Sequence, residues 1–523
     1  MQNLKAIHPA ILSAVSGLLL FAAWPVSPFT FLIFIAFVPL LIMEDRGMSR
    51  LLFFVYTNLA LLIWNIGTTW WTCNSTVPGG IAAMLANSLL MSIPWIGFYN
   101  VKKRMGSKAG YISFIIFWLC FEYIHLNWEL SWPWLTIGNV FATHPGWVQW
   151  YEYTGVGGGS LWVMLVNLLV FFALKKNRRA SIALGIVLVL PFVVTIIMGS
   201  SGEAGQGKSN IVVVQPNVDP WDEKFAAGKQ EAQLQKLIQL SESKIDPDTR
   251  LVVWPETAIP VAINEDSLKN SYFILPVWGF LKAHPSINLV TGIEGFRFYK
   301  ENNKSATARR IPESAAYFDS YNSAVIMDSN DFKIYHKSKL VPGAEIMPSF
   351  LHFLDSWFEK FGGTTGGYVG QKERTVLKSF NNSYRIAPAV CYESIYGEFM
   401  SKYICNGANI ITVITNDGWW GNTAGYRQHE NYARLRAIET RRWVVRSANT
   451  GISCFIDPWG KVIDPQPWDK TAAIKLTVPT DGQEQFTFYT RVGDLIFKIA
   501  VVLTLLMIGW NLFVMIKNRL NRG

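Results

Sequence analysis

Residues 250–258, with the sequence RLVVWPETA, decide the fold class of the larger part of the chain. A short apolar run rich in valine ends at Trp254 and Pro255, and Glu256 follows directly. An apolar run bounded by turn residues predicts a buried strand. The sequence therefore predicts that the Glu256 carboxylate lies at the end of a strand.

Similar runs recur on both sides of this stretch, and helical patterns separate some of them. The further strand-like runs are 210–218, 287–296, 321–341, 384–394 and 408–421. Residues 222–245 are polar and helix-like, and residues 428–447 have helical composition and periodicity. Residues 451–464 predict a hairpin that turns at Pro458-Trp459-Gly460. Strands that alternate with helices predict an α/β domain with helices packed on sheets.

The N-terminal part of the chain has a different character. The whole sequence is 50% hydrophobic and only 16% charged, which indicates a mixed membrane and soluble architecture. Seven apolar runs near the length of a membrane span occupy about 8–24, 29–43, 51–71, 79–99, 111–127, 158–174 and 181–198, and an eighth occupies 495–516. The first run could be a cleaved signal peptide, but it lacks small residues spaced for cleavage and six more runs follow. We therefore expect a polytopic α-helical membrane protein with about eight transmembrane helices.

The basic residues predict the orientation of these helices. Lysines and arginines occupy alternate loops, whereas the loops 25–28, 72–78 and 128–157 contain none. By the positive-inside rule, both termini are then cytoplasmic and residues 200–490 lie outside. Most of the net charge of +10 thus reflects topology, and we expect no nucleic-acid partner. The predicted domains are a membrane domain at 1–200, an extracytoplasmic catalytic domain at 208–482 and a C-terminal helix at 493–516.

Three strand ends carry reactive side chains: Glu256, Lys337 and Cys391. A thiol attacks a carbonyl as the thiolate, so it needs a base or a nearby cation. A carboxylate can take the proton, and a lysine ammonium can stabilise the oxyanion that develops. A Cys–His dyad remains open, since catalytic partners need not be neighbours in sequence. Its candidate histidines are His336, His352 and His429. The five cysteines show no CxxC or Cys/His spacing, so neither a disulfide scaffold nor a metal site is expected.

Four ordered blocks, WPETA, YHKSKLVPGAE, APAVCYES and ITNDGWWG, resemble the signature blocks of the nitrilase (carbon–nitrogen hydrolase) superfamily. The resemblance implies an αββα sandwich in which Glu256 is the general base, Lys337 the oxyanion stabiliser and Cys391 the nucleophile. It also implies that Glu345 orients the lysine. Glu393 and Tyr392 are expected to support the site.

Together with the apolar runs, the blocks SWPWLTIGN (131–139) and HENYARLRAIETRRWVVRSANTGIS (429–453) resemble the apolipoprotein N-acyltransferase family. The resemblance implies ping-pong transfer of an acyl chain from a phospholipid to the α-amine of an N-terminal diacylglyceryl-cysteine. The intermediate is a thioester on Cys391, the usual donor is phosphatidylethanolamine, and no cofactor is needed. The implied location is the bacterial cytoplasmic (inner) membrane, with the catalytic domain in the periplasm.

The chain departs from the family pattern at two places. It has Leu340-Val-Pro-Gly-Ala-Glu345 where the family has Leu-Val-Pro-Phe-Gly-Glu, so the conformation of this loop is open. Glu122 and His125 replace a Glu-Trp-x-x-Arg neighbourhood. Ionisable groups at the end of a spanning helix have either a structural partner or a function, and the sequence leaves both open.

Aromatic side chains near the site are candidates for contact with lipid or substrate. In the segment after Glu345, aromatic residues recur at helical spacing, which is typical either of a helix packed on the domain or of an amphipathic lid over 345–370. The candidates are Trp221, Phe350, Phe353, Trp357, Phe358 and Trp420.

Three other functions remain in competition. The same triad could serve a membrane-tethered amidase that uses water as the acceptor. The outer domain could instead belong to a transporter or sensor that only binds a ligand. Finally, the acyl chain could pass to a different amine, such as that of a glycolipid.

Overall fold

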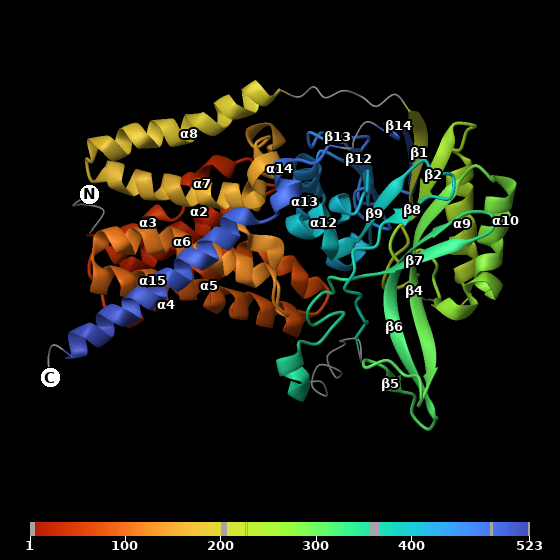
Figure 1. Cartoon of the computed structure of the whole chain (residues 1–523), viewed down its shortest axis with the longest axis horizontal. Coiled ribbons are helices and arrows are strands. Elements are labelled where there is room, and N and C mark those ends of the chain that lie inside the picture. The colour runs from red at the N-terminus through yellow and green to blue at the C-terminus, as the bar shows by residue number, and fades with distance from the viewer. Residues whose placement is uncertain are drawn as a thin grey trace. The chain divides into compact units, whose positions relative to one another are not determined.

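Figure 1 shows the computed structural model of the chain, which describes residues 6–199, 207–224, 226, 228–354, 367–481 and 485–520. The chain divides into two compact units. The helical unit comprises residues 1–73, 77–199 and 492–523, and the sheet unit comprises residues 74–76 and 200–491.

Among the described residues, six helices of the helical unit are long and apolar enough to cross a membrane. They are α4 (Arg50–Thr69), α5 (Val77–Met105), α6 (Ser107–Leu126), α7 (Tyr151–Leu174), α8 (Arg178–Met198) and α15 (Leu495–Leu520). The prediction of several long apolar helices in the N-terminal region is confirmed.

The first two predicted spans form shorter helices. The first gives α2 (Pro9–Ala23), a helix of 15 residues. Such a helix rises only about 22 Å, at roughly 1.5 Å per residue, whereas the bilayer core is roughly 30 Å thick. The second run is divided into the 3₁₀ turn η1 (Thr30–Phe34) and the helix α3 (Val38–Glu44). The total of eight crossings therefore stays a prediction.

A buried asparagine explains the break between η1 and α3. Asn167 of α7 donates its side-chain amide to the carbonyl of Ile33 at 2.8 Å. Its side-chain oxygen accepts from the N–H of Phe37, also at 2.8 Å. These two bonds satisfy main-chain groups that a continuous helix would have paired internally.

The sheet unit contains two β-sheets. The first has the strand order β14-β1-β2-β4-β6-β5, with β3 paired to β4 and β7 paired to β6. Its strands are β1 (Lys208–Gln215), β2 (Thr249–Val253), β3 (Ala262–Asn264), β4 (Asn288–Lys300), β5 (Arg309–Arg310), β6 (Ala316–Met327), β7 (Phe332–His336) and β14 (Ala472–Pro479). Since β1, β2 and β4 are parallel, their C-terminal ends lie at one edge of the sheet.

The second sheet has the strand order β13-β12-β11-β10-β9-β8. Its strands are β8 (Leu377–Lys378), β9 (Arg385–Val390), β10 (Ile410–Thr415), β11 (Trp443–Ala448), β12 (Cys454–Ile456) and β13 (Val462–Ile463). The strands β9, β10 and β11 are parallel and almost entirely buried, as expected for strands covered on both faces.

Helices cover the outer face of each sheet, so the sheet unit has four layers (Figure 1). The helices α9 (Gln230–Glu242) and α10 (Leu275–Ala283) bury leucines and other apolar residues against β1, β2 and β4. On the second sheet, α12 (Gly397–Cys405) contacts β9 and α13 (Ala424–Thr440) contacts β11. The two sheets meet at β1 and β11, where the Ser447 hydroxyl donates to the carbonyl of Val214 at 2.8 Å. The predicted α/β sandwich is observed.

Local predictions are partly confirmed. The hairpin at 451–464 forms from β12 and β13, which pair antiparallel. The helix predicted over 428–447 is wrong at its end, because Arg441 adopts a left-handed conformation (φ 49°) that stops α13, and Trp443 begins β11. In the polar segment 222–245, the helix begins only at Gln230.

Candidate active site

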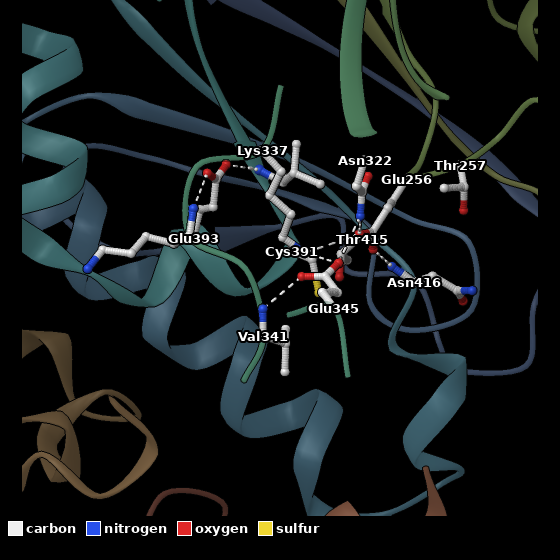
Figure 2. Close-up of polar contacts among 12 residues, drawn as sticks. Glu256, Thr257, Asn322, Lys337, Val341, Glu345, Cys391, Glu393, Thr415 and Asn416 are labelled. Carbon is white, nitrogen blue, oxygen red and sulfur yellow. Dashed lines mark hydrogen bonds and ion pairs between the residues drawn. The ribbon is translucent and has the colours of Figure 1, made fainter. Parts of the chain in front are cut away.

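The carboxylate of Glu256 is fixed from several sides at the end of β2 (Figure 2). Its Oε1 accepts from the side-chain amide of Asn322 at 2.8 Å and lies 3.5 Å from Nζ of Lys337. Its Oε2 accepts from the main-chain N–H of Asn416, just beyond β10, at 3.0 Å. Glu256 is thus buried and oriented, with a cation next to its carboxylate.

Lys337 directly follows β7 and is 1% exposed. Its Nζ donates to Oε1 of Glu345 at 2.8 Å. Burial alone lowers the pKa of Lys337, but the carboxylates of Glu345 and Glu256 outweigh burial and raise this pKa well above its ordinary value. Lys337 therefore stays an ammonium and can stabilise negative charge, but it cannot act as a base.

Cys391 lies at the turn between β9 and the 3₁₀ turn η9 (Cys391–Ile395), with a φ of 51° in the left-handed region. This conformation is unfavourable for a residue with a side chain and recurs at functional sites. Burial raises the pKa of the Cys391 thiol, and the negative charge of Glu256 raises it further, while Lys337 lowers it. The resting thiol is therefore protonated and needs a base to become a nucleophile.

Glu345 and Asn322 complete the charged cluster. Glu345 accepts from the Asn322 amide at 3.0 Å and from the N–H of Val341 at 2.8 Å, which anchors the 340–345 loop. Asn322, on β6, donates to both Glu256 and Glu345 and so sets the spacing of two carboxylates around one lysine. The sequence prediction included Glu345 but missed Asn322.

Glu393 connects the loop after β7 with the strand that precedes Cys391. Its Oε1 accepts from the Tyr335 hydroxyl at 2.7 Å and from the N–H groups of Ser338 and Lys339 at 2.6 and 3.1 Å. Its Oε2 accepts from the N–H of Val390 at 2.8 Å. Because Lys337 and Cys391 adjoin these groups, Glu393 holds the two strand ends together.

Tyr392 lies beside the cysteine and is buried. Its ring packs edge-on against Tyr396 at a centroid distance of 5.2 Å. In this position Tyr392 contributes to the packing under η9.

The geometry of the described histidines favours a carboxylate base over a Cys–His dyad. His429 pairs through Nδ1 with Asp417 at 2.9 Å, and its Nε2 lies 3.0 Å from the main-chain oxygen of Cys391. His336 pairs through Nε2 with Glu265 at 2.8 Å. The side chain of His352 lies outside the described part of the chain.

A pocket of about 620 Å³ opens beside the site. Aromatic and acidic residues contribute to its lining, among them Trp221, Trp419, Trp468, Asp219, Glu223 and Asp469. Trp221 is 58% exposed and meets Trp419 edge-on at 4.9 Å. Gly418, which also lines the pocket, is only two residues from Asn416, whose N–H donates to the Glu256 carboxylate. The pocket therefore adjoins the end of β10, next to Glu256.

The remaining aromatic candidates are not gathered at this pocket. Phe350 is exposed, and Trp420 is half-buried with its ring 5.6 Å from that of His429. The side chain of Phe353 and the residues Trp357 and Phe358 lie outside the described part of the chain, so the lid stays a prediction.

Glu122 and His125 have structural partners within the helical unit. Glu122 accepts from the Trp118 indole at 3.0 Å and from the N–H of Ile137 at 2.7 Å. His125 contacts the Asn87 side-chain oxygen at 2.8 Å and accepts from an indole N–H through its other nitrogen. These contacts give both residues a role in holding the helix end.

Comparison with known proteins agrees with this geometry. An apolipoprotein N-acyltransferase from Chlorobaculum tepidum is 30% identical over 93% of this chain and 93% of its own length. The chain belongs to the apolipoprotein N-acyltransferase family. Accordingly, the family model "Apolipoprotein N-acyltransferase N-terminal domain" matches residues 16–169, and the model "Carbon-nitrogen hydrolase" matches residues 210–482.

Two other proteins, one compared by sequence and one by structure, are also similar to this chain. The apolipoprotein N-acyltransferase of Thermotoga maritima is 25% identical over 96% of this chain and 94% of its own length. Among solved structures, a carbon–nitrogen hydrolase from Helicobacter pylori G27 aligns with a TM-score of 0.37 and 15% identity, covering 55% of this chain and 94% of that chain.

Proposed function

We propose that this chain transfers an acyl group from a membrane phospholipid to the α-amine of an N-terminal diacylglyceryl-cysteine on lipoproteins. The observation that carries the proposal is the buried cluster in which Glu256, Lys337 and Cys391 interact at neighbouring strand ends. Membership of the acyltransferase family supports this function and does not favour the amidase alternative.

In the first half-reaction, Glu256 takes the thiol proton and the Cys391 sulfur attacks the ester carbonyl of the phospholipid. A carbon–sulfur bond forms while the carbonyl electron pair moves to oxygen, and the Lys337 ammonium stabilises this oxyanion. The tetrahedral intermediate then collapses, the ester carbon–oxygen bond breaks, and Glu256 returns the proton to the leaving oxygen. The products are a lysophospholipid and a thioester on Cys391.

In the second half-reaction, the neutral α-amine attacks the thioester carbonyl. Glu256 accepts a proton from the attacking nitrogen as the carbon–nitrogen bond forms. Collapse of the second intermediate breaks the carbon–sulfur bond, and the proton on Glu256 returns to the departing sulfur. Exclusion of water by a lipid-lined site would protect the thioester from hydrolysis.

The reaction also implies a donor and a location. We take phosphatidylethanolamine as the donor and the bacterial cytoplasmic (inner) membrane as the location, with both termini in the cytoplasm and the sheet unit in the periplasm. The alternation of loops that contain Lys or Arg with loops that contain neither supports this orientation. Cys405, which is exposed in the sheet unit, should then react with a membrane-impermeant maleimide added to intact spheroplasts. Protection of Cys405 until the membrane is permeabilised would contradict the orientation.

Mass spectrometry of the purified protein tests the chemistry. Incubation with vesicles of defined phospholipid should add one acyl mass to Cys391, and a diacylated lipopeptide with a free α-amine should remove it. Cys391→Ala should show no adduct, whereas Cys405→Ala should behave as the wild type. The proposal fails if the wild type forms no adduct on Cys391, or if the adduct is discharged by water alone and not by the amine.

A further inference from the structure

A second buried lysine, Lys224, lies next to Glu256 on its main-chain side. It is 3% exposed and lies in the polar stretch that precedes α9. Its Nζ donates to the main-chain oxygen of Glu256 at 3.3 Å and to the hydroxyl of Thr257. Burying a lysine is unfavourable unless its charge is compensated, so this placement needs an explanation.

The turn that Lys224 contacts is itself strained. Thr257 has a φ of 44°, a left-handed conformation that a β-branched residue rarely adopts. Such a conformation persists where surrounding contacts fix it. Lys224 supplies two of those contacts, one to each residue of the Glu256–Thr257 turn.

The positive charge of Lys224 adds an electrostatic interaction to these contacts. Burial lowers the pKa of Lys224 to about 8, while the carboxylates of Glu256 and Glu294 act in the opposite direction. Lys224 is therefore still mainly protonated at neutral pH. Glu256 thus lies between two ammonium groups, with Lys337 at its carboxylate and Lys224 at its main chain.

Lys224 also connects the base to the loop that carries Trp221. The N–H of Lys224 donates to the carbonyl of Asp219 at 2.9 Å. In turn, the Asp219 carboxylate accepts from the N–H of Trp221 at 2.8 Å. Lys224 therefore contacts both the pocket-lining loop and the main chain of Glu256, so a change in the loop can shift the position of Glu256.

We propose that Lys224 is a positioning residue that holds the Glu256–Thr257 turn so that the carboxylate faces the Cys391 thiol. This inference rests on the proposed function, in which Glu256 is the base. Without the two bonds from Lys224, the turn can relax from its left-handed conformation and the carboxylate moves away from the sulfur. The chemical step then slows, whereas binding of the phospholipid, which Lys224 does not contact in this role, stays the same.

The test compares Lys224→Met, Lys224→Arg and the matched control Lys244→Met, which removes an exposed lysine after α9. Three quantities are measured at neutral pH on the full-length protein: kcat and KM for thioester formation with phosphatidylethanolamine vesicles, the rate of Cys391 alkylation by iodoacetamide, and the midpoint of thermal unfolding. The alkylation rate reports the alignment of base and thiol without any acyl donor.

We expect Lys224→Met to lower kcat for thioester formation by about 10-fold to 100-fold, since a displacement of roughly 1 Å costs about that much. In Lys224→Met, KM should stay within about twofold of the wild-type value, and the rate of Cys391 alkylation should fall by a factor similar to that of kcat. Lys224→Arg should recover most of the wild-type kcat because it keeps the charge and the donors. Lys244→Met should match the wild type. A wild-type kcat in Lys224→Met overturns the inference, and so does a loss confined to KM or a Lys224→Arg variant as slow as Lys224→Met.

Two further outcomes have defined meanings. If Lys224→Met does not fold, Thr257→Ala decides, because it removes one acceptor and leaves the lysine in place: a severalfold lower kcat supports the inference and a wild-type kcat overturns it. If the wild type forms no thioester with any phospholipid, the proposed function fails, and the alkylation rates still test the alignment of Glu256 and Cys391.

Discussion

Gly292 on β4 lies directly against the turn that carries Glu256. We predict that Gly292→Ala slows thioester formation by roughly 100-fold. Its N–H donates to the carbonyl of Pro255 at 3.0 Å, and its carbonyl accepts from the N–H of Ala258 at 2.9 Å. A Cβ at this position would lie 2.4 Å from N of Thr257 and 2.6 Å from Cα of Glu256, whereas ordinary contacts begin at 3.4 Å. Both neighbours are main-chain atoms, so the turn itself must move by about 1 Å to restore an ordinary contact. Such a displacement costs roughly 100-fold in rate, and overpacking adds about 1–3 kcal/mol of destabilisation.

The assay is the time course of the thioester on Cys391 after mixing with phospholipid vesicles, together with urea unfolding of each variant. Gly279 provides the matched control, because it is an exposed glycine of α10 where an added Cβ would meet no atom within 4 Å. Gly279→Ala should acylate at the wild-type rate and gain about 0.5–1 kcal/mol in unfolding free energy. A Gly292→Ala variant that acylates as fast as the wild type would refute the reasoning that the contact with β4 sets the position of Glu256.

Three other predictions follow from the contacts of the site. Asn322→Ala removes a hydrogen-bond donor from two carboxylates and should slow thioester formation by about 10-fold to 100-fold, since hydrogen bonds to charged groups contribute about 1.5–3 kcal/mol. An unchanged time course of thioester formation by mass spectrometry would contradict this prediction. Glu393→Gln places an amide N–H₂ opposite a main-chain N–H and should lower the unfolding free energy by about 1–3 kcal/mol in urea titration, and equal midpoints would exclude this effect. The pKa of Lys224 is about 8, so its positive charge, which faces Glu256 and Glu294, is present below that pH and lost above it. The wild-type rate of thioester formation should therefore fall as pH rises through about 8. Lys224→Arg should keep its rate to higher pH, and identical pH–rate profiles would contradict this assignment.

The sequence was sufficient to predict that Glu256, Lys337 and Cys391 lie at strand ends. Apolar runs end just before Glu256 and Cys391, and in the structure Glu256, Lys337 and Cys391 each follow a strand of the sandwich. Parallel strands covered on both faces are continuous in apolar residues, so their ends are visible in sequence.

The sequence did not reveal the residues that hold these three in place. Asn322 lies inside β6, and its two carboxylate partners come from other segments, one of them 66 positions away. Lys224 lies in a polar stretch where one more lysine is unremarkable, and its burial depends on the turn at Thr257. In both cases the signal is a long-range contact, which periodicity and local composition do not contain.

The proposed catalytic groups come from both sheets, and this has a consequence for how the protein responds to heat. Glu256 and Lys337 extend from β2 and β7 of the first sheet, whereas Cys391 and Asn416 extend from β9 and β10 of the second. Sliding of one layer past the other would separate the base from the sulfur while every strand kept its own ladder of hydrogen bonds. Acyl transfer should therefore decline on warming before either sheet melts, which makes catalysis a more sensitive gauge of the contact between the layers than any measure of secondary structure.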